Sequence, residues 1–377
     1  GINWVYAPVL DLDVEPENPI VGTRSFGSDP ERVAALGRAW IEACQGAGVA
    51  ACGKHFPGHG RTLEDSHLAF PVVRADRETL EADLTPFRRV ADEAAAMMTA
   101  HVGYPALGGE GPATLEPTIL RELLRDEMGF EGMVISDALV MEGFGGGTAA
   151  TEGWRAVRAL RAGCDLLLYP SDLEQSIRTI RQAAEQDPDL EASIERALER
   201  SSAALERFPP GTGEGPSTAS PAEAAEVADL ALGCVKARGR APGEVLARDR
   251  PLRLHPMSDD AGPFAAGRFG EFLAAELGER GWDVEVVEDP SAGGDPAEGQ
   301  TLVALEATPR AWKGRASLSG ASASAVAAAL DASSAGYLVL FGHPRILEQL
   351  DREGAVAWSS EPVMERAAAR WLDERVP

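Results

Sequence analysis

The N-terminal half of the chain alternates between short apolar runs and longer segments with helical periodicity. The apolar runs have the length of buried strands, and they span Trp4–Leu12, Val49–Phe56, Ala95–Val102, Gly132–Asp137 and Cys164–Tyr169. Helical patterns cover Pro30–Ala47, Glu78–Glu93, Thr118–Met128, Glu152–Ala162 and the stretch from Leu173 to about Arg207. Ser28 or Asp29 is suited to cap the first helix, and Pro30 fits its first turn. This alternation predicts a parallel sheet with crossover helices.

A second pattern of the same kind follows a segment rich in proline, glycine, serine and threonine. That segment, residues 209–221, indicates a linker between domains. Beyond it, strands are expected at Leu252–Leu254, Asp283–Val287, Thr301–Leu305 and Tyr337–Phe341. Helices are expected at Ala222–Gly233, Gly267–Arg280, Ala321–Ala332 and Pro362–Glu374. We therefore expect one domain over residues 1–208 and a smaller three-layer α/β domain over residues 222–377.

Polar residues gather where the strands of the first domain end. They are Asp11, Asp13, Lys54, His55, His101, Asp137 and Ser171. Because α/β barrels keep their chemistry at the carboxyl ends of their strands, this placement predicts a catalytic domain of the (β/α)8 TIM-barrel type. The chain opens within a strand, so about three β/α units of such a barrel are expected to be absent from its start. An incomplete sheet exposes two edges, which predicts impaired stability or a compensating partner.

The charge balance narrows the range of partners. The chain has 35 basic and 60 acidic residues and a net charge of −25, whereas nucleic-acid binding needs a basic surface. We therefore expect no nucleic acid and a neutral or uncharged small-molecule substrate. No stretch approaches about 18 consecutive apolar residues, so no membrane span is expected. The 4 cysteines form no CxxC pair, which argues against a zinc ribbon or a redox pair. Oligomeric state and compartment stay open.

The densest group of ionisable residues is the segment Lys54–His67, KHFPGHGRTLEDSH. Pro57 and two glycines exclude a helix here, so its histidines do not share a helical face as in HExxH metalloproteases. Asp65 and His67 lie two residues apart on a loop and can hydrogen-bond. A carboxylate fixes the imidazole tautomer and raises its basicity, which makes His67 a candidate general acid/base. Burying the ammonium of Lys54 is costly without a partner, which favours a binding role.

Asp137 ends the run Gly132–Asp137, GMVISD, at the predicted mouth of the barrel. A carboxylate in this place suits a nucleophile, and the alternative is a cap for the turn that follows. Three of the other histidines are interpreted as structural. His59 is expected to be a core or turn residue, and His255 and His343 are expected to be structural in the second domain.

Three motifs resemble glycoside hydrolase family 3, in particular its bacterial β-N-acetylglucosaminidase (β-N-acetylhexosaminidase) branch. They are KHFPGHGxxxxDSH, the upstream APVLD…NP…RSFG and the downstream ISDALVM. The resemblance covers roughly residues 1–207 strongly. The second domain is similar, more loosely, to the C-terminal α/β sandwich of two-domain members. The resemblance implies hydrolysis of terminal β-linked N-acetylglucosamine, which extends the expected small-molecule substrate to an oligosaccharide.

The resemblance also implies a role for each matching residue. Asp137 would be the nucleophile, and His67 the acid/base that Asp65 orients. The substrate-binding residues that it implies are Arg24, Lys54, His55, Asp11 and Met141. It implies neither a metal nor a cofactor. The reaction would retain configuration through two displacements, with the His–Asp pair in place of the usual second carboxylate.

Three alternatives remain beside this interpretation. Nothing here matches the Asp-containing, glycine-rich loop that follows the third barrel strand in the family, which leaves open a truncated, catalytically impaired member. Some members of the branch use phosphate as acceptor, which leaves a phosphorylase open. Histidines and aspartates could also serve a metal-dependent barrel hydrolase, although no HxH ends a strand.

Overall fold

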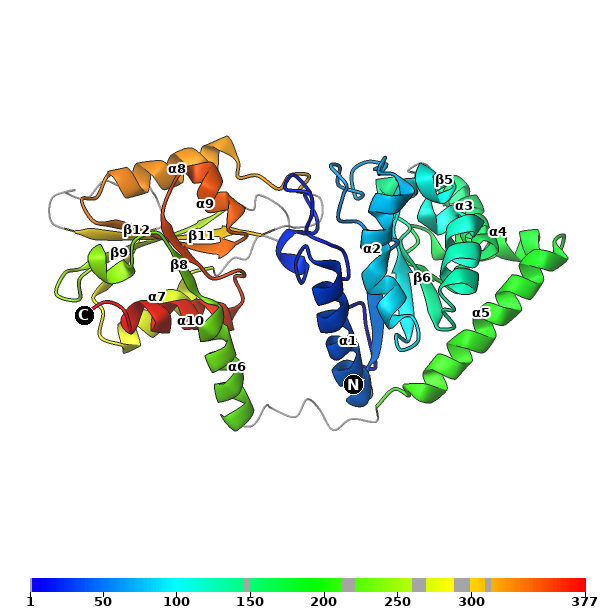
Figure 1. The fold of residues 1–377 in the computed structure, drawn as a ribbon, viewed down its shortest axis with the longest axis horizontal. Helices are drawn as coiled ribbons and strands as arrows, with labels where there is room; N and C mark the ends of the chain where they lie inside the picture. The colour runs from blue at the N-terminus through cyan, green and yellow to red at the C-terminus, as the bar shows by residue number, and fades with distance from the viewer. Residues whose placement is uncertain (1, 146–148, 212–220, 260–268, 288–298, 309–312) are drawn as a thin grey trace. The chain divides into compact units, whose positions relative to one another are not determined.

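The structure is a computed structural model, and it describes residues 2–145, 149–211, 221–259, 269–287, 299–308 and 313–377. The chain divides into two compact units, Gly1–Pro216 (unit 1) and Ser217–Pro377 (unit 2), drawn in Figure 1. Most of the expected linker, residues 212–220, lies outside the described residues. None of the helices over the described residues combines the length and the apolar character that a membrane span requires.

Unit 1 is built on a parallel sheet of five strands in the order β1-β2-β3-β6-β7. The strands are β1 Trp4–Val5, β2 Ala50–Phe56, β3 Ala96–Thr99, β6 Met133–Ala138 and β7 Leu166–Leu168. Each lies within one of the apolar runs of the sequence, except that β6 extends one residue beyond its run, to Ala138, so the predicted parallel sheet is confirmed. Consecutive strands of this sheet are neighbours, so their carboxyl ends follow one another along a single edge.

The predicted helices of unit 1 lie in the connections between these strands and after β7, the last of them. They are α1 Pro30–Gly46, α2 Arg77–Val90, η4 Thr118–Glu127, α3 Ala149–Ala162, α4 Leu173–Ala184 and α5 Pro188–Arg207. Of the two candidate caps of α1, the structure uses Asp29, whose carboxylate accepts the N–H of Arg32 at 2.7 Å. The helix η4 has π-type hydrogen bonding at its end, where the N–H of Met128 donates to the carbonyl of Leu123.

The two faces of the sheet have different surroundings. Successive strand residues point to opposite faces. Val134 of β6 joins the large core that α1, α2, η4 and α3 cover, whereas Ile135 joins a smaller cluster on the other face. Cys52 of β2 belongs to the same smaller cluster. Lys54 comes two residues after Cys52 and Asp137 two residues after Ile135. Because side chains alternate between the faces, both project from this second face at the strand ends.

Three details of unit 1 differ from the predicted pattern. The first strand is shorter than Trp4–Leu12, since Pro8 has no N–H to offer the ladder. The chain still runs along β2, because the N–H of Leu10 donates to the carbonyl of Lys54 at 2.7 Å. A two-stranded antiparallel sheet, β4 Gly103–Tyr104 with β5 Gly109–Pro112, was not predicted. Short 3-10 turns also occur at η1 Gly22–Arg24, η2 Pro105–Leu107, η3 Ala113–Leu115 and η5 Glu142–Phe144.

Unit 2 has a sheet of six strands in the order β10-β9-β11-β12-β13-β8, in which only β8 is antiparallel to its neighbour. The strands are β8 Lys236–Arg238, β9 Leu252–Ser258, β10 Val284–Val286, β11 Gln300–Ala307, β12 Gly336–Gly342 and β13 Gly354–Val356. The helices are α6 Pro221–Cys234, α7 Glu271–Glu279, α8 Gly320–Asp331, α9 Arg345–Leu350 and α10 Pro362–Asp373, with a 3-10 turn η6 at Pro242–Glu244.

Helices pack on both faces of this sheet, as the three-layer prediction requires. The core under α7 and α10 contains Leu302 of β11, and the core under α8 and α9 contains the next residue, Val303 (Figure 1). The short strands β8 and β13 and the helix α9 were not predicted. The expected helix Gly267–Arg280 begins only at Glu271, and its residues 267–268 lie outside the described residues.

The packing of α2 on the sheet generates a stability prediction. Phe87 of α2 is fully buried, and its ring centroid lies 5.5 Å from that of Phe56 in an edge-to-face contact. Phe87→Ala should lower the free energy of unfolding of unit 1 by about 3–5 kcal/mol, because the ring leaves a cavity. Leu36→Ala on α1, where the side chain is 40% exposed, should cost less than about 1 kcal/mol. Calorimetric unfolding measures both, and equal effects would contradict the packing.

Candidate active site

The ionisable residues that end neighbouring strands lie along one edge of the sheet of unit 1. Lys54 and His55 belong to the end of β2, and Asp137 belongs to the end of β6. His101 comes just after β3, the strand between them. The structure therefore brings together the strand-end residues that the sequence places on different segments.

Asp137 is partly buried, and its surroundings favour the charged carboxylate. Burial alone would raise its pKa, but His55, His101, the N–H of Ala138 and Lys54 together hold the pKa below its usual value. The N–H of Ala138 donates to Oδ1 of Asp137 at 2.8 Å. An ionised carboxylate with this set of neighbours can act as a nucleophile or stabilise a positive charge.

His101 contacts the end of β6, the strand that contains Asp137. The residue is fully buried, which lowers the pKa of the imidazole and favours its neutral form. Its Nε2 lies 3.1 Å from the carbonyl oxygen of Ala138, which can only accept, so Nε2 carries the proton. Nδ1 then accepts from the hydroxyl of Thr114 at 2.8 Å. His101 thus ties the end of β3 to the residue that follows Asp137.

Two cationic side chains approach the same edge. Burial lowers the pKa of Lys54, and the charge of Arg24 lowers it further, while Asp137, Cys52 and Asp11 act in the opposite direction. Arg24 reaches this position from η1, where its guanidinium donates to the carbonyl of Ile20 at 3.2 Å. The Lys54 ammonium makes no hydrogen bond or ion pair with the part of the chain that the structure describes, so it can donate to a bound ligand.

Asp11, which is expected to bind substrate, lies against His55 and His59. It is fully buried, and its Oδ2 lies 2.7 Å from Nδ1 of His55. Its Oδ1 accepts the backbone N–H groups of His55 and His59, at 3.1 and 2.7 Å. Burial would raise the pKa of Asp11, but His55 and His59 bring it down to about 2. In the structure Asp11 therefore positions His55 and His59, while its expected contact with substrate stays a prediction.

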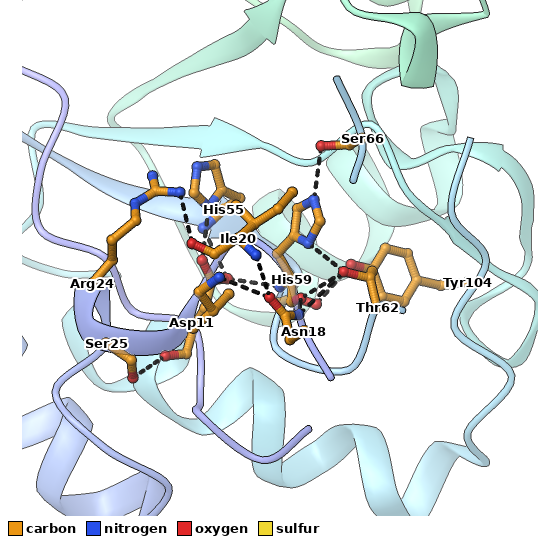
Figure 2. A network of polar contacts seen from close by, with 12 residues as sticks. Asp11, Asn18, Ile20, Arg24, Ser25, His55, His59, Thr62, Ser66 and Tyr104 are labelled. Atoms are coloured by element: carbon orange, nitrogen blue, oxygen red, sulfur yellow. Dashed lines mark hydrogen bonds and ion pairs between the residues drawn. The ribbon is translucent and has the colours of Figure 1, made fainter. Parts of the chain in front are cut away.

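His59 lies in the interior of a polar network that Figure 2 shows. Only 1% of the residue is exposed, and its two ring nitrogens lie 2.8 Å from Thr62 Oγ1 and 2.9 Å from Ser66 Oγ. Asn18 donates to the carbonyl of His59 at 2.9 Å. Burial, with the charge of His55, lowers the pKa of His59 to about 4. The residue is a neutral core histidine, in keeping with its structural interpretation.

Asp65 and His67 form the predicted pair. Oδ1 of Asp65 lies 2.7 Å from Nδ1 of His67 and accepts the backbone N–H of the same residue at 2.9 Å. The Asp65 side chain is 1% exposed and the His67 side chain 16%. The carboxylate therefore fixes the ring with a proton on Nδ1 and directs Nε2 away from the pair, where it can exchange a proton with a ligand.

The loop with this pair is attached to the loop that follows Asp137. The N–H of Gly143 in η5 donates to the carbonyl of Ser66 at 2.8 Å. Only glycine fits there, since a Cβ on Gly143 would lie 2.7 Å from that oxygen and 2.9 Å from the carbonyl oxygen of His101. Met141 is 2% exposed and lies in the turn between Asp137 and η5, and its expected contact with substrate stays a prediction.

Several supporting residues were not identified from the sequence. Asn18 accepts the N–H groups of Ile20 and Val21 while its amide donates to His59, and Tyr104 donates to the carbonyl of Gly58 at 2.7 Å. The Asn-Pro dipeptide at Asn18 was the one available signal, as a turn former. Within the described residues, no three His, Cys, Asp or Glu side chains are placed to hold a metal ion together.

A parallel sheet with crossover helices, an ionised carboxylate at a strand end and an imidazole–carboxylate pair on a neighbouring loop place unit 1 in the α/β class. The chain belongs to glycosyl hydrolase family 3, since the model of that family's N-terminal domain matches residues 1–203.

Relatives with curated names agree with this family. A β-hexosaminidase of Alkalilimnicola ehrlichii is 43% identical over 194 residues, covering 50% of this chain and 53% of that protein. A β-hexosaminidase of Pseudomonas aeruginosa is 45% identical over 174 residues, covering 46% and 51%. The chain thus spans about half the length of these relatives. The solved β-N-acetylglucosaminidase of Paenibacillus sp. has a TM-score of 0.84 at 28% identity, covering 100% of this chain and 75% of that one.

The buried histidines generate a prediction about pH. His59 has a pKa of about 4 in the folded chain, below the ordinary value of about 6.5, and burial lowers the pKa of His55 as well. Between about pH 6.5 and 4 the unfolded chain binds a proton that folded His59 does not, so the free energy of unfolding falls by up to about 3 kcal/mol as pH decreases.

Urea unfolding at pH 7.5, 5.5 and 4.5 measures this fall. His59→Gln should make it shallower, whatever the variant does to the stability at pH 7.5. An unchanged pH dependence in His59→Gln would contradict the neutral, buried state of this residue.

Proposed function

We propose that the chain removes terminal β-linked N-acetylglucosamine from oligosaccharides or peptidoglycan fragments, with retention of configuration. The observation that carries the proposal is the Asp65–His67 pair on a loop that is hydrogen-bonded to the turn after Asp137. One carboxylate and one oriented imidazole are the groups that a double displacement needs. The β-hexosaminidase names of the relatives support a hexosamine, and the β-N-acetylglucosaminidase of Paenibacillus sp. supports N-acetylglucosamine as this sugar.

In the first step, the carboxylate of Asp137 attacks the anomeric carbon of the sugar. His67 donates the proton on Nε2 to the glycosidic oxygen as the carbon–oxygen bond breaks, and a covalent glycosyl-enzyme forms. The negative charge of Asp65 stabilises the imidazolium that donates this proton. The low pKa of Asp137 keeps the nucleophile ionised when this acid is protonated.

In the second step, neutral His67 removes a proton from water, and the oxygen attacks the anomeric carbon from the face that the leaving group left. The bond to Asp137 breaks, and the sugar leaves with its original configuration. Arg24, Lys54 and His55 are the groups we assign to the sugar hydroxyls. Asp11 holds His55 through Nδ1, so that Nε2 of this ring faces the ligand.

We further propose that the sheet of unit 1 belongs to a domain of the (β/α)8 TIM-barrel type and that unit 2 is the α/β sandwich of two-domain members. Residues 1–208 would form the catalytic domain, 209–221 the linker and 222–377 the second domain. The parallel strand order and the TM-score of 0.84 to the Paenibacillus enzyme support this assignment.

The assay for this function is release of 4-nitrophenol from 4-nitrophenyl N-acetyl-β-D-glucosaminide. Asp137→Asn should lower kcat by at least about 1,000-fold, because no covalent intermediate forms, and His67→Gln by about 100-fold or more. Asp92→Asn is the control, since Asp92 is an exposed partner of Arg38 at the opposite end of β3. Turnover by Asp137→Asn equal to that of the unchanged chain would refute the role of Asp137.

The acceptor of the second step follows from the same assay with inorganic phosphate. A histidine acid/base repels a phosphate anion less than a glutamate would, and Lys54 and Arg24 add positive charge at this edge. Formation of N-acetylglucosamine 1-phosphate, with faster nitrophenol release, would identify a phosphorylase. Free N-acetylglucosamine at an unchanged rate would identify water as the acceptor.

A further inference from the structure

Ser66 is the residue through which the acid/base loop is held from two sides. Ser66 is 1% exposed and directly precedes His67 in the chain. The side chain is held by the ring of His59, at 2.9 Å from Nε2. The backbone carbonyl is held by Gly143, which belongs to the turn after Asp137. Ser66 therefore connects the strand-end network of Asp11 to the segment that contains the nucleophile.

His59 is a rigid support for this serine. Its backbone N–H donates to the buried carboxylate of Asp11 at 2.7 Å, and its carbonyl accepts from Asn18 at 2.9 Å. Its second ring nitrogen contacts Thr62, which in turn accepts from the amide of Asn18 at 3.2 Å. Figure 2 shows Ser66 and Thr62 at the two ring nitrogens of His59 and Asn18 at its backbone. Both backbone polar groups and both ring nitrogens of His59 are thus occupied.

Over the described ranges of the chain, only one arrangement of the protons gives the hydroxyls of both Thr62 and Ser66 an acceptor. The Thr62 hydroxyl donates to the carbonyl of His59 at 3.2 Å, and the ring donates from Nδ1 to Thr62 Oγ1. Nε2 is then bare and accepts the proton of Ser66 Oγ. In the other tautomer, the Ser66 proton has no acceptor among the described residues, which is unfavourable for a buried hydroxyl.

We propose that His59 and Ser66 are positioning residues, whose hydrogen bond sets the orientation of the His67–Asp65 pair relative to Asp137. The inference rests on the proposed function and adds to it the residues that control proton transfer. Loss of the bond would leave Asp137 in place on β6 but let the His67 ring move. The defect would then appear in the protonation of the leaving group rather than in the attack of the nucleophile.

The test compares two substrates that differ only in their need for an acid. Dinitrophenolate leaves without protonation, whereas phenolate needs a proton from His67. In Ser66→Ala, kcat/KM for the phenyl N-acetyl-β-D-glucosaminide should fall about tenfold or more, and for the 2,4-dinitrophenyl substrate by less than about twofold. The ratio of the two values is independent of how much of the sample is folded, so a stability defect does not produce this result.

Two further variants make the comparison specific. Ser193→Ala removes a buried serine hydroxyl on α5, bonded to the carbonyl of Asp189, and should leave the ratio unchanged. His59→Gln should change the ratio in the same direction as Ser66→Ala. The double variant should be no worse than the more impaired single variant, because both changes break one contact.

A parallel loss on both substrates in Ser66→Ala would overturn the positioning role while leaving the proposed function intact. Absence of turnover by the unchanged chain would instead count against the proposed function. A spectroscopic measurement tests the positioning in either case. Imidazole nitrogen–proton spectra should show His59 with its proton on Nδ1, and Ser66→Ala should shift the His67 ring signals. Unshifted His67 signals, or a proton on Nε2 of His59, would refute the inference.

Discussion

The arrangement of the strand ends in the candidate active site depends on one buried carboxylate. Asp11 has lost its contact with water, and the three N–H groups of His55 and His59 that it accepts replace the hydration of its charge. These groups come from the start of the segment Lys54–His67, whose two glycines and one proline do not by themselves favour a single conformation. Asp11 follows β1, whereas His55 lies at the end of β2 and His59 just after it, so the same contacts also fasten the short edge strand to the sheet.

The elements that could be predicted from the sequence are those whose signal is local. The apolar runs that became β2, β3 and β6 are long enough to be recognised without knowing their neighbours. By contrast, β8 and β13 are strands of three residues, and they exist only because each has a partner to pair with. A ladder partner distant in the chain leaves no trace in the periodicity of such short segments.

The same distinction explains which parts of the site were predicted. Asp65 and His67 are two residues apart, so their contact follows from a short loop alone. Asp11 and His55 are separated by 44 positions, and whether an oxygen of Asp11 faces a ligand or a backbone N–H depends on tertiary packing. Met141 was assigned to the substrate because of the motif around it, whereas its burial follows from the turn that Gly143 closes.

The close approach at Gly143 also makes the site an all-or-none assembly. The loop that contains Asp65 and His67 lies between β2 and β3 in the chain. The N–H of Gly143, which donates to the carbonyl of Ser66 in this loop, comes only after β6. A chain emerging from the ribosome could pair β1, β2 and β3 and still lack both the nucleophile and a fixed acid/base. Under the proposed function, partly folded molecules would therefore have no weak, unselective activity, because the pairing of β6 supplies both Asp137 and the contact that fixes the loop of His67.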